Sequence, residues 1–149
     1  MIILLKKYLL FLFLLLKVTF LEAQSDSLVL ACPLVNGTPR IIRASDKDYQ
    51  KSSEYGVMFT SKTDTLVQAV HDAQVVLVAR NPEDQTFDVV LQYKSYMFWY
   101  SGVISTKTKQ GSRVKAGDII GTYKTGNLLE LLMYLREEPV NPRKYLLCK

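Results

Sequence analysis

Residues 73–100, AQVVLVARNPEDQTFDVVLQYKSYMFWY, decide the class of this fold. Three runs rich in β-branched and aromatic residues are separated by short polar segments, which is typical of consecutive strands joined by hairpins. Within the second run, the apolar residues Phe87, Val89 and Leu91 occupy every second position. This two-residue period is typical of a half-buried strand. The stretch therefore predicts strands over 73–80, 87–93 and 96–100.

The flanking sequence continues this pattern. LVQAV (66–70) precedes the stretch, and RVKAGDIIGTY (113–123) follows it with glycines that suit tight turns. Only residues 44–53 and 142–146 read as helical turns. There is no repeat, no low-complexity tract and no second domain. We expect an all-β fold, an antiparallel sandwich or barrel-like arrangement of short strands with short loops.

The first 23 residues have the layout of a secretory signal peptide. The basic start MIILLKK leads into the apolar run YLLFLFLLL, and Ala23 offers a cleavage point. An uncleaved anchor is the alternative, and VLAC at 29–32 is a weak lipidation signal at Cys32. We expect a signal peptide at 1–23, a polar lead at 24–32 and one domain at 33–149. The chain would then be exported, to the periplasm or outside the cell.

The two cysteines, Cys32 and Cys148, lie near the two ends of the expected domain. An oxidising compartment favours a disulfide between them, which would tie the termini together. Two buried free thiols are the alternative.

The net charge of the chain is +5. It falls to +3 on removal of residues 1–23, which carry three lysines and one glutamate. A local excess of cations remains at Lys107, Lys109, Arg113, Lys115 and Lys124, opposed only by Asp118. These side chains read either as solvated faces of a hairpin or as a surface that attracts an anionic polymer. Export argues against a nucleic-acid partner.

A single histidine, His71, limits the possible chemistry. It lies in a predicted turn, and neither a G-x-S-x-G elbow nor a phosphate-cradling glycine loop accompanies it. Catalytic zinc sites take three protein ligands, typically including histidine. The residues alone therefore point to no catalytic group, no metal site and no cofactor.

Several motifs taken in order resemble the LytM/lysostaphin-type zinc peptidases, which cut peptidoglycan cross-bridges. GSRVKAGDIIG is similar to that family's hairpin, LVQAVHDAQVV to its V-x-A-x-x-D-G-x-V segment, and WYSGVIS to its Y-A-H-L segment. Tyr55-Gly56-Val57 resembles the middle of H-x-G-x-D, PVNPRKYL resembles the closing P-V-N-P-x-x-Y-L, and CPLVNGTPRII corresponds to the first strand. The resemblance implies the family's all-β domain.

The same resemblance predicts a degenerate site. The positions that match the family's metal-binding and catalytic residues are occupied here by Glu54, Met58, Gly102, Leu128 and Glu130. Positions that build strands and turns match the family's motifs, whereas the positions of its metal-binding and catalytic side chains do not. The resemblance therefore implies a non-catalytic module that binds an envelope protein, such as a cell-wall amidase, or peptidoglycan. Membrane contact is expected only through an uncleaved signal segment or lipidation.

Aromatic side chains suit the lining of such a binding groove. The candidates are Tyr55, Tyr96, Trp99, Tyr100, Tyr123 and Tyr134. Two other functions remain open: a peptidoglycan hydrolase with an altered site using Glu54 and Glu130, and a biotinyl- or lipoyl-like carrier barrel, suggested by V-K-A-G-D.

In the stretch TGNLLELLMYL (125–135), the helix propensity of the residues conflicts with the strand pattern of the rest of the chain. The residues of this stretch are good helix formers, and a helix would begin near Asn127. In a β-rich chain we predict instead a strand over 128–135, because tertiary pairing overrides helix propensity. Alternation then gives one face that carries Glu130 and a second, wholly apolar face for the core, made of Leu129, Leu131, Met133 and Leu135.

Overall fold

The computed structural model describes residues 27–40 and 55–148, and strands dominate this part of the chain. The strands are β1 (Thr38–Arg40), β2 (Val57–Thr60), β3 (Leu66–Gln68), β4 (Ala73–Arg80), β5 (Phe87–Tyr93), β6 (Tyr96–Val103), β7 (Ser105–Thr106), β8 (Arg113–Val114), β9 (Ile119–Thr122), β10 (Leu129–Leu135) and β11 (Glu138–Val140). A single 3-10 turn, η2 (Pro142–Lys144), follows them within the described residues. The all-β prediction is confirmed.

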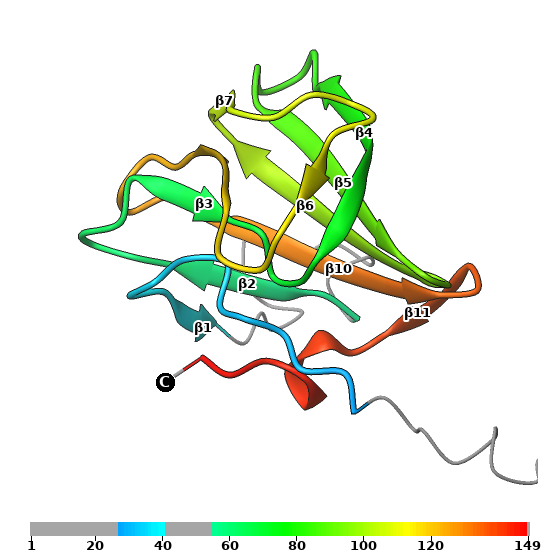
Figure 1. The fold of residues 1–149 in the computed structure, drawn as a ribbon. Coiled ribbons are helices and arrows are strands. Elements are labelled where there is room, and N and C mark those ends of the chain that lie inside the picture. The colour runs from blue at the N-terminus through cyan, green and yellow to red at the C-terminus, as the bar shows by residue number, and fades with distance from the viewer. Residues whose placement is uncertain (1–26, 41–54, 149) are drawn as a thin grey trace, which may run out of the picture.

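The strands form two antiparallel sheets. The larger has the order β1-β2-β10-β6-β5-β4-β8, with β11 also paired to β10, and the smaller has the order β3-β9-β7. In Figure 1 the orange strand β10 crosses the middle of the molecule, with β2 on one side and β5 and β6 on the other. The order of the larger sheet places two strands far apart in sequence, β2 and β6, on either side of β10.

The three strands of the opening stretch occur where the sequence predicts them, as β4, β5 and β6. The turn expected at 142–146 appears as η2, and the first strand expected within CPLVNGTPRII appears as β1. The helical turn expected at 44–53 and the signal peptide expected at 1–23 lie outside the described residues.

Residues 129–135 form a strand, not a helix, and their pairing explains why. β10 is hydrogen-bonded to β2 and β6 on its two sides and also to β11. Leu129, Leu131 and Met133 are buried to 1% exposure or less. Ladder bonds on both sides and a buried apolar face stabilise the strand more than helix propensity, worth tenths of a kcal/mol per residue, could stabilise a helix.

The core lies on one face of the large sheet and includes one fully buried tyrosine. The Tyr100 hydroxyl accepts a hydrogen bond from the Val70 amide at 2.8 Å, and burial raises the pKa of Tyr100. The tyrosine therefore joins Phe98 and Leu91 in the core without leaving its hydroxyl unsatisfied.

Tyr100→Phe is expected to lower the free energy of unfolding by about 1–3 kcal/mol, because the buried Val70 amide loses its partner. Urea denaturation at neutral pH measures the loss. Tyr96→Phe is the matched control, because no hydrogen bond involves the Tyr96 hydroxyl within the described residues; it should change stability by less than about 0.5 kcal/mol. Equal losses in the two variants would contradict the role given to the Tyr100 hydroxyl.

The same variant has a signature in alkaline solution. Because the folded pKa of Tyr100 lies above that of an unfolded tyrosine, its contribution to stability is complete below about pH 10 and is lost as the pH rises further. Tyr100→Phe should therefore flatten the decline of stability above pH 10, measured as the urea midpoint against pH.

The ends of the described domain are joined covalently and through the backbone. Cys32 and Cys148 form a disulfide, as the sequence favours. Leu30 pairs with the C-terminal segment, donating from its amide to the Tyr145 carbonyl at 2.8 Å and accepting from Leu147 at 2.9 Å. In the disulfide, the Cys32 sulfur is bonded to that of Cys148. A disulfide suits an oxidising, extracytoplasmic compartment.

None of the residues that the structure describes belongs to a helix with the length and hydropathy of a membrane span.

Candidate functional site

The candidate site lies on the face of the large sheet that points away from the core, here called the outer face. Residues opposite each other in an antiparallel ladder share a face. Glu130 of β10 lies opposite Met58 of β2 and Ser101 of β6, and Leu132 lies opposite Trp99. These side chains alternate with the core residues of β10, so the face predicted to carry Glu130 is formed as expected.

Four of the five positions singled out by the resemblance come together across β2, β10 and β6. Met58 and Glu130 are cross-strand neighbours. Gly102 follows Ser101, the partner of Glu130, and an ideal Cβ at Gly102 would lie 2.8 Å from the Leu128 carbonyl oxygen. Residues from three distant parts of the chain thus meet at one place. The fifth position, Glu54, lies outside the described residues.

The meeting point is buried although it does not belong to the core cluster. Met58 is 8% exposed and Glu130 is 9% exposed. An ideal Cβ at Gly56 would lie 2.9 Å from Glu130 Oε1 and 2.8 Å from Leu132 Cδ2. Both side chains therefore pack directly against this glycine. Glu130 also takes part in a further polar interaction. The Glu130 carboxylate is therefore largely withdrawn from solvent, with Met58 and Leu132 among its neighbours.

The backbone at Gly102 is specific for glycine. Its φ of +95° is in the left-handed half of conformational space, and a Cβ there would meet the Leu128 carbonyl. A histidine, the residue that the resemblance would place here, has neither a favourable backbone conformation nor room for its Cβ. The local backbone at this position therefore favours glycine over any residue with a side chain.

Gly102→Ala is expected to lower the free energy of unfolding by about 2–4 kcal/mol, from backbone strain combined with the contact to Leu128. Gly111→Ala separates the two causes, because Gly111 has a similar φ of +89° but no atom within 4 Å of its ideal Cβ. That control should lose only about 1 kcal/mol. Thermal melts of both variants test the difference, and equal losses would show that the contact to Leu128 is unimportant.

The residues at this place do not fit a zinc ion. The described positions supply one carboxylate, from Glu130, while Met58, Leu128 and Gly102 offer no hard or borderline ligand. The only histidine of the chain, His71, lies between β3 and β4, with its ring 4.2 Å from the Tyr93 ring. No group of three or more His, Cys, Asp or Glu side chains in residues 27–40 and 55–148 is placed to hold a metal.

The six aromatic residues expected to line a groove divide between two faces. Trp99 and Tyr134 are half-buried and lie on the outer face with Leu132. Tyr55 is 46% exposed, next to Gly56. These three are accessible to a ligand.

The other three aromatic residues correct the expectation. Tyr100 and Tyr123 are buried in the core, and Tyr96 packs against it, with its ring stacked on Phe98. Alternation along β6 sends Tyr96, Phe98 and Tyr100 inward. Tyr123 is retained inside because its hydroxyl is satisfied by the Ser61 amide and by the Asn127 carbonyl. None of the three lines the outer face.

One polar pair on the outer face, Ser101 with Asp88, was not predicted from the sequence. The Ser101 hydroxyl donates to Asp88 Oδ1 at 2.9 Å, joining β6 to β5 beside the position of Glu130. The alternation of residues 87–93 places Asp88 on this face, but only the register of β5 against β6 identifies its partner.

Comparison with known proteins identifies a family. The model of Peptidase family M23 matches residues 52–142, more than half of the chain. No curated protein sequence matches this chain.

Solved structures share the fold at low sequence identity. Csd3 of Helicobacter pylori, in its orthorhombic crystal, superposes with a TM-score of 0.65 at 22% identity, over 83% of this chain and 36% of that one. The SpoIIQ-SpoIIIAH pore forming complex contains a chain with a TM-score of 0.65 at 18% identity, over 81% of this chain and 92% of that one. The solution structure of lysostaphin gives a TM-score of 0.56 at 21% identity, over 74% of this chain and 48% of that one. This chain thus spans about a third of the length of Csd3.

Proposed function

The chain belongs to peptidase family M23, and on that premise we propose that it uses the family's fold for binding in the cell envelope rather than for hydrolysis. One observation carries the proposal. The four described positions that meet there, Met58, Gly102, Leu128 and Glu130, supply one carboxylate and no imidazole. A metal-activated water needs several fixed ligands and an open coordination position, and these residues provide neither.

The outer face is the proposed binding surface. Trp99 lies opposite Leu132 across β6 and β10, and Tyr134 is two residues further along β10, so an aromatic-aliphatic strip crosses the two strands. Flat aromatic rings beside aliphatic groups suit stacking against peptide or sugar rings. The SpoIIQ-SpoIIIAH complex gives a case in which a protein of this fold is found in a complex with another protein.

The proposed location is the bacterial envelope, in the periplasm or outside the cell. The signal-peptide layout of residues 1–23 and the Cys32–Cys148 disulfide both support export. The proposed partner is an envelope protein, such as a cell-wall amidase, or peptidoglycan itself.

Binding is tested with the purified protein in two assays, a pull-down from envelope extract and co-sedimentation with isolated sacculi. Wild-type protein should enrich a partner or sediment, and Trp99→Ala should reduce that signal roughly tenfold, as expected for an aromatic anchor. Val35→Ala is the control, because Val35 is 69% exposed and lies beside Leu66 and Ile119 of the smaller sheet rather than on β6 or β10. Absence of any partner and of sedimentation would refute the proposal.

A second candidate, a hydrolase with an altered site, rests on the buried carboxylate of Glu130. Metal analysis and a peptidoglycan digestion assay distinguish the two functions. The binding function predicts neither bound metal nor released fragments. Stoichiometric metal that disappears in Glu130→Ala or Glu54→Ala would favour the hydrolase. The carrier barrel is set aside, because the family match includes the V-K-A-G-D hairpin on which it rested.

A further inference from the structure

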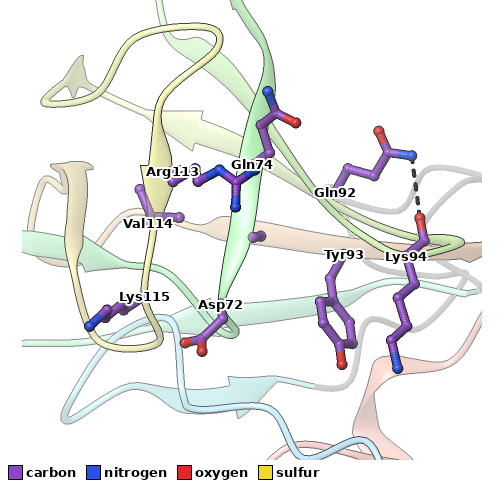
Figure 2. A pocket seen from close by; sticks show the side chains of 9 residues that line it. Asp72, Gln74, Gln92, Tyr93, Lys94, Arg113, Val114 and Lys115 are labelled. Carbon is purple, nitrogen blue, oxygen red and sulfur yellow. Dashed lines mark hydrogen bonds between the residues drawn. The ribbon is translucent and has the colours of Figure 1, made fainter.

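A hollow of about 410 Å³ lies at the edge of the large sheet, away from the outer-face site. Its polar lining comprises Asp72, Gln74, Gln92, Lys94, Arg113 and Lys115. Figure 2 shows Arg113, Val114 and Lys115 on one side of it and Tyr93 and Lys94, from the β5–β6 hairpin, on the other. Its size is within the range of small-molecule sites.

The hollow is separate from the place where Glu130 lies. Gln92 is opposite Met97 on β6, whereas Glu130 is opposite Ser101, four residues further along the same strand. Four residues of extended strand correspond to about 13 Å. The hollow also involves β4 and β8, on the other side of β5 from β10.

Strand register places three polar side chains of the hollow in one row. Arg113 of β8 pairs with Gln74 of β4, and Gln74 pairs with Gln92 of β5. The Gln92 amide donates to the Lys94 carbonyl at 3.3 Å, which anchors that side chain. A guanidinium and two carboxamides are therefore presented side by side on rigid strands.

Charge indicates the ligand. Three lining side chains are cationic, and one, Asp72, is a carboxylate whose Oδ1 accepts from the Ala116 amide at 2.9 Å. Within the described part of the chain, neither Arg113 nor Lys115 forms an ion pair. The excess of positive charge attracts an anion, and the planar donors of Arg113 match a carboxylate in bidentate geometry.

We propose that this hollow binds the carboxyl-terminal end of a short peptide. Arg113 and Lys115 take the terminal carboxylate, the amides of Gln74 and Gln92 hydrogen-bond the peptide groups, and Asp72 attracts an ammonium group. Asp72 also disfavours a phosphate dianion through like-charge repulsion. The proposal is independent of the proposed function, because the side chains of the hollow belong to the β4–β8 edge of the sheet and do not include the strip of Trp99, Leu132 and Tyr134.

The test is titration of the purified protein with trialanine, followed by amide chemical shifts in NMR spectra. Trialanine should shift the resonances of Gln74, Gln92 and Lys115, and trialanine amide should bind roughly tenfold more weakly because it lacks the carboxylate. Arg113→Gln should weaken trialanine binding by a similar factor. Arg80→Gln is the matched control, because Arg80 is exposed at the far end of β4; it should bind as the wild type does.

Several results would overturn the proposal. They are the absence of localised shifts with trialanine, equal binding of trialanine and its amide, and unchanged binding in Arg113→Gln. Tighter binding of inorganic phosphate than of trialanine would assign the hollow to another anion. Lys115→Gln serves as a second variant should Arg113→Gln melt below the wild type. Failure of this test leaves the outer-face assays unaffected, so the two proposals fail separately.

Discussion

Loss of the Cys32–Cys148 disulfide is expected to lower the free energy of unfolding by about 4–5 kcal/mol. The bridge joins residues separated by 116 positions, so it restricts the unfolded chain across nearly the whole described domain. Other bonds between the two ends are few, chiefly those of Leu30 with Tyr145 and Leu147. For a domain of this size, such a loss corresponds to a fall in Tm of about 15 °C or more.

The measurement compares oxidised wild type, reduced wild type and the double variant Cys32→Ser with Cys148→Ser in thermal melts. The reduced protein and the double variant should melt together, well below the oxidised protein. A count of free thiols in the unreduced, unfolded protein should give none. Coincident melts of all three forms would contradict a stabilising disulfide.

Two adjacent leucines of β10 are expected to have opposite effects on stability and binding. Leu131 is fully buried among core residues, so Leu131→Ala should cost about 3–4 kcal/mol through lost burial and the cavity that remains. Leu132 is half-buried on the outer face, and Leu132→Ala should cost about 1 kcal/mol or less.

Binding to the envelope partner should show the reverse order. Leu132→Ala removes a side chain beside Trp99 and should weaken binding several-fold. Leu131→Ala should retain binding at a temperature where it remains folded. Urea denaturation supplies the stabilities, and the pull-down supplies the binding. Similar stability losses at the two positions would contradict the strand alternation, whereas similar binding would contradict the choice of the outer face as the surface.

Local sequence was sufficient for most strands. β4, β5 and β6 lie where the alternation and the polar hairpin segments predict them, because each pattern is contained within fewer than ten neighbouring residues. The pairing of Cys32 with Cys148 also agreed with the structure, since only two cysteines were available. Tyr96, Tyr100 and Tyr123 were harder to place, because an aromatic side chain in a strand suits either face until the core is defined.

The candidate site also combines features that follow from the sequence with features that follow only from strand pairing. That the chain has one histidine, far too few for the zinc chemistry of its relatives, is a property of the composition and needs no coordinates. That Met58, Gly102 and Glu130 meet depends on the pairing of β10 with β2 and β6, segments about 30 to 70 residues distant from one another. The positive φ of Gly102 and the row of Arg113, Gln74 and Gln92 likewise depend on register.

By itself, then, the sequence determined the all-β class, the places of most strands and the presence of a single histidine. The strand at 129–135, predicted against its helix propensity, is confirmed. Tertiary structure alone decided which aromatic rings are buried and which polar groups share a surface. The physical reason is that side-chain alternation is encoded by adjacent residues, whereas cross-strand neighbours are selected by hydrogen-bonded ladders and by the core that forms when the whole chain folds.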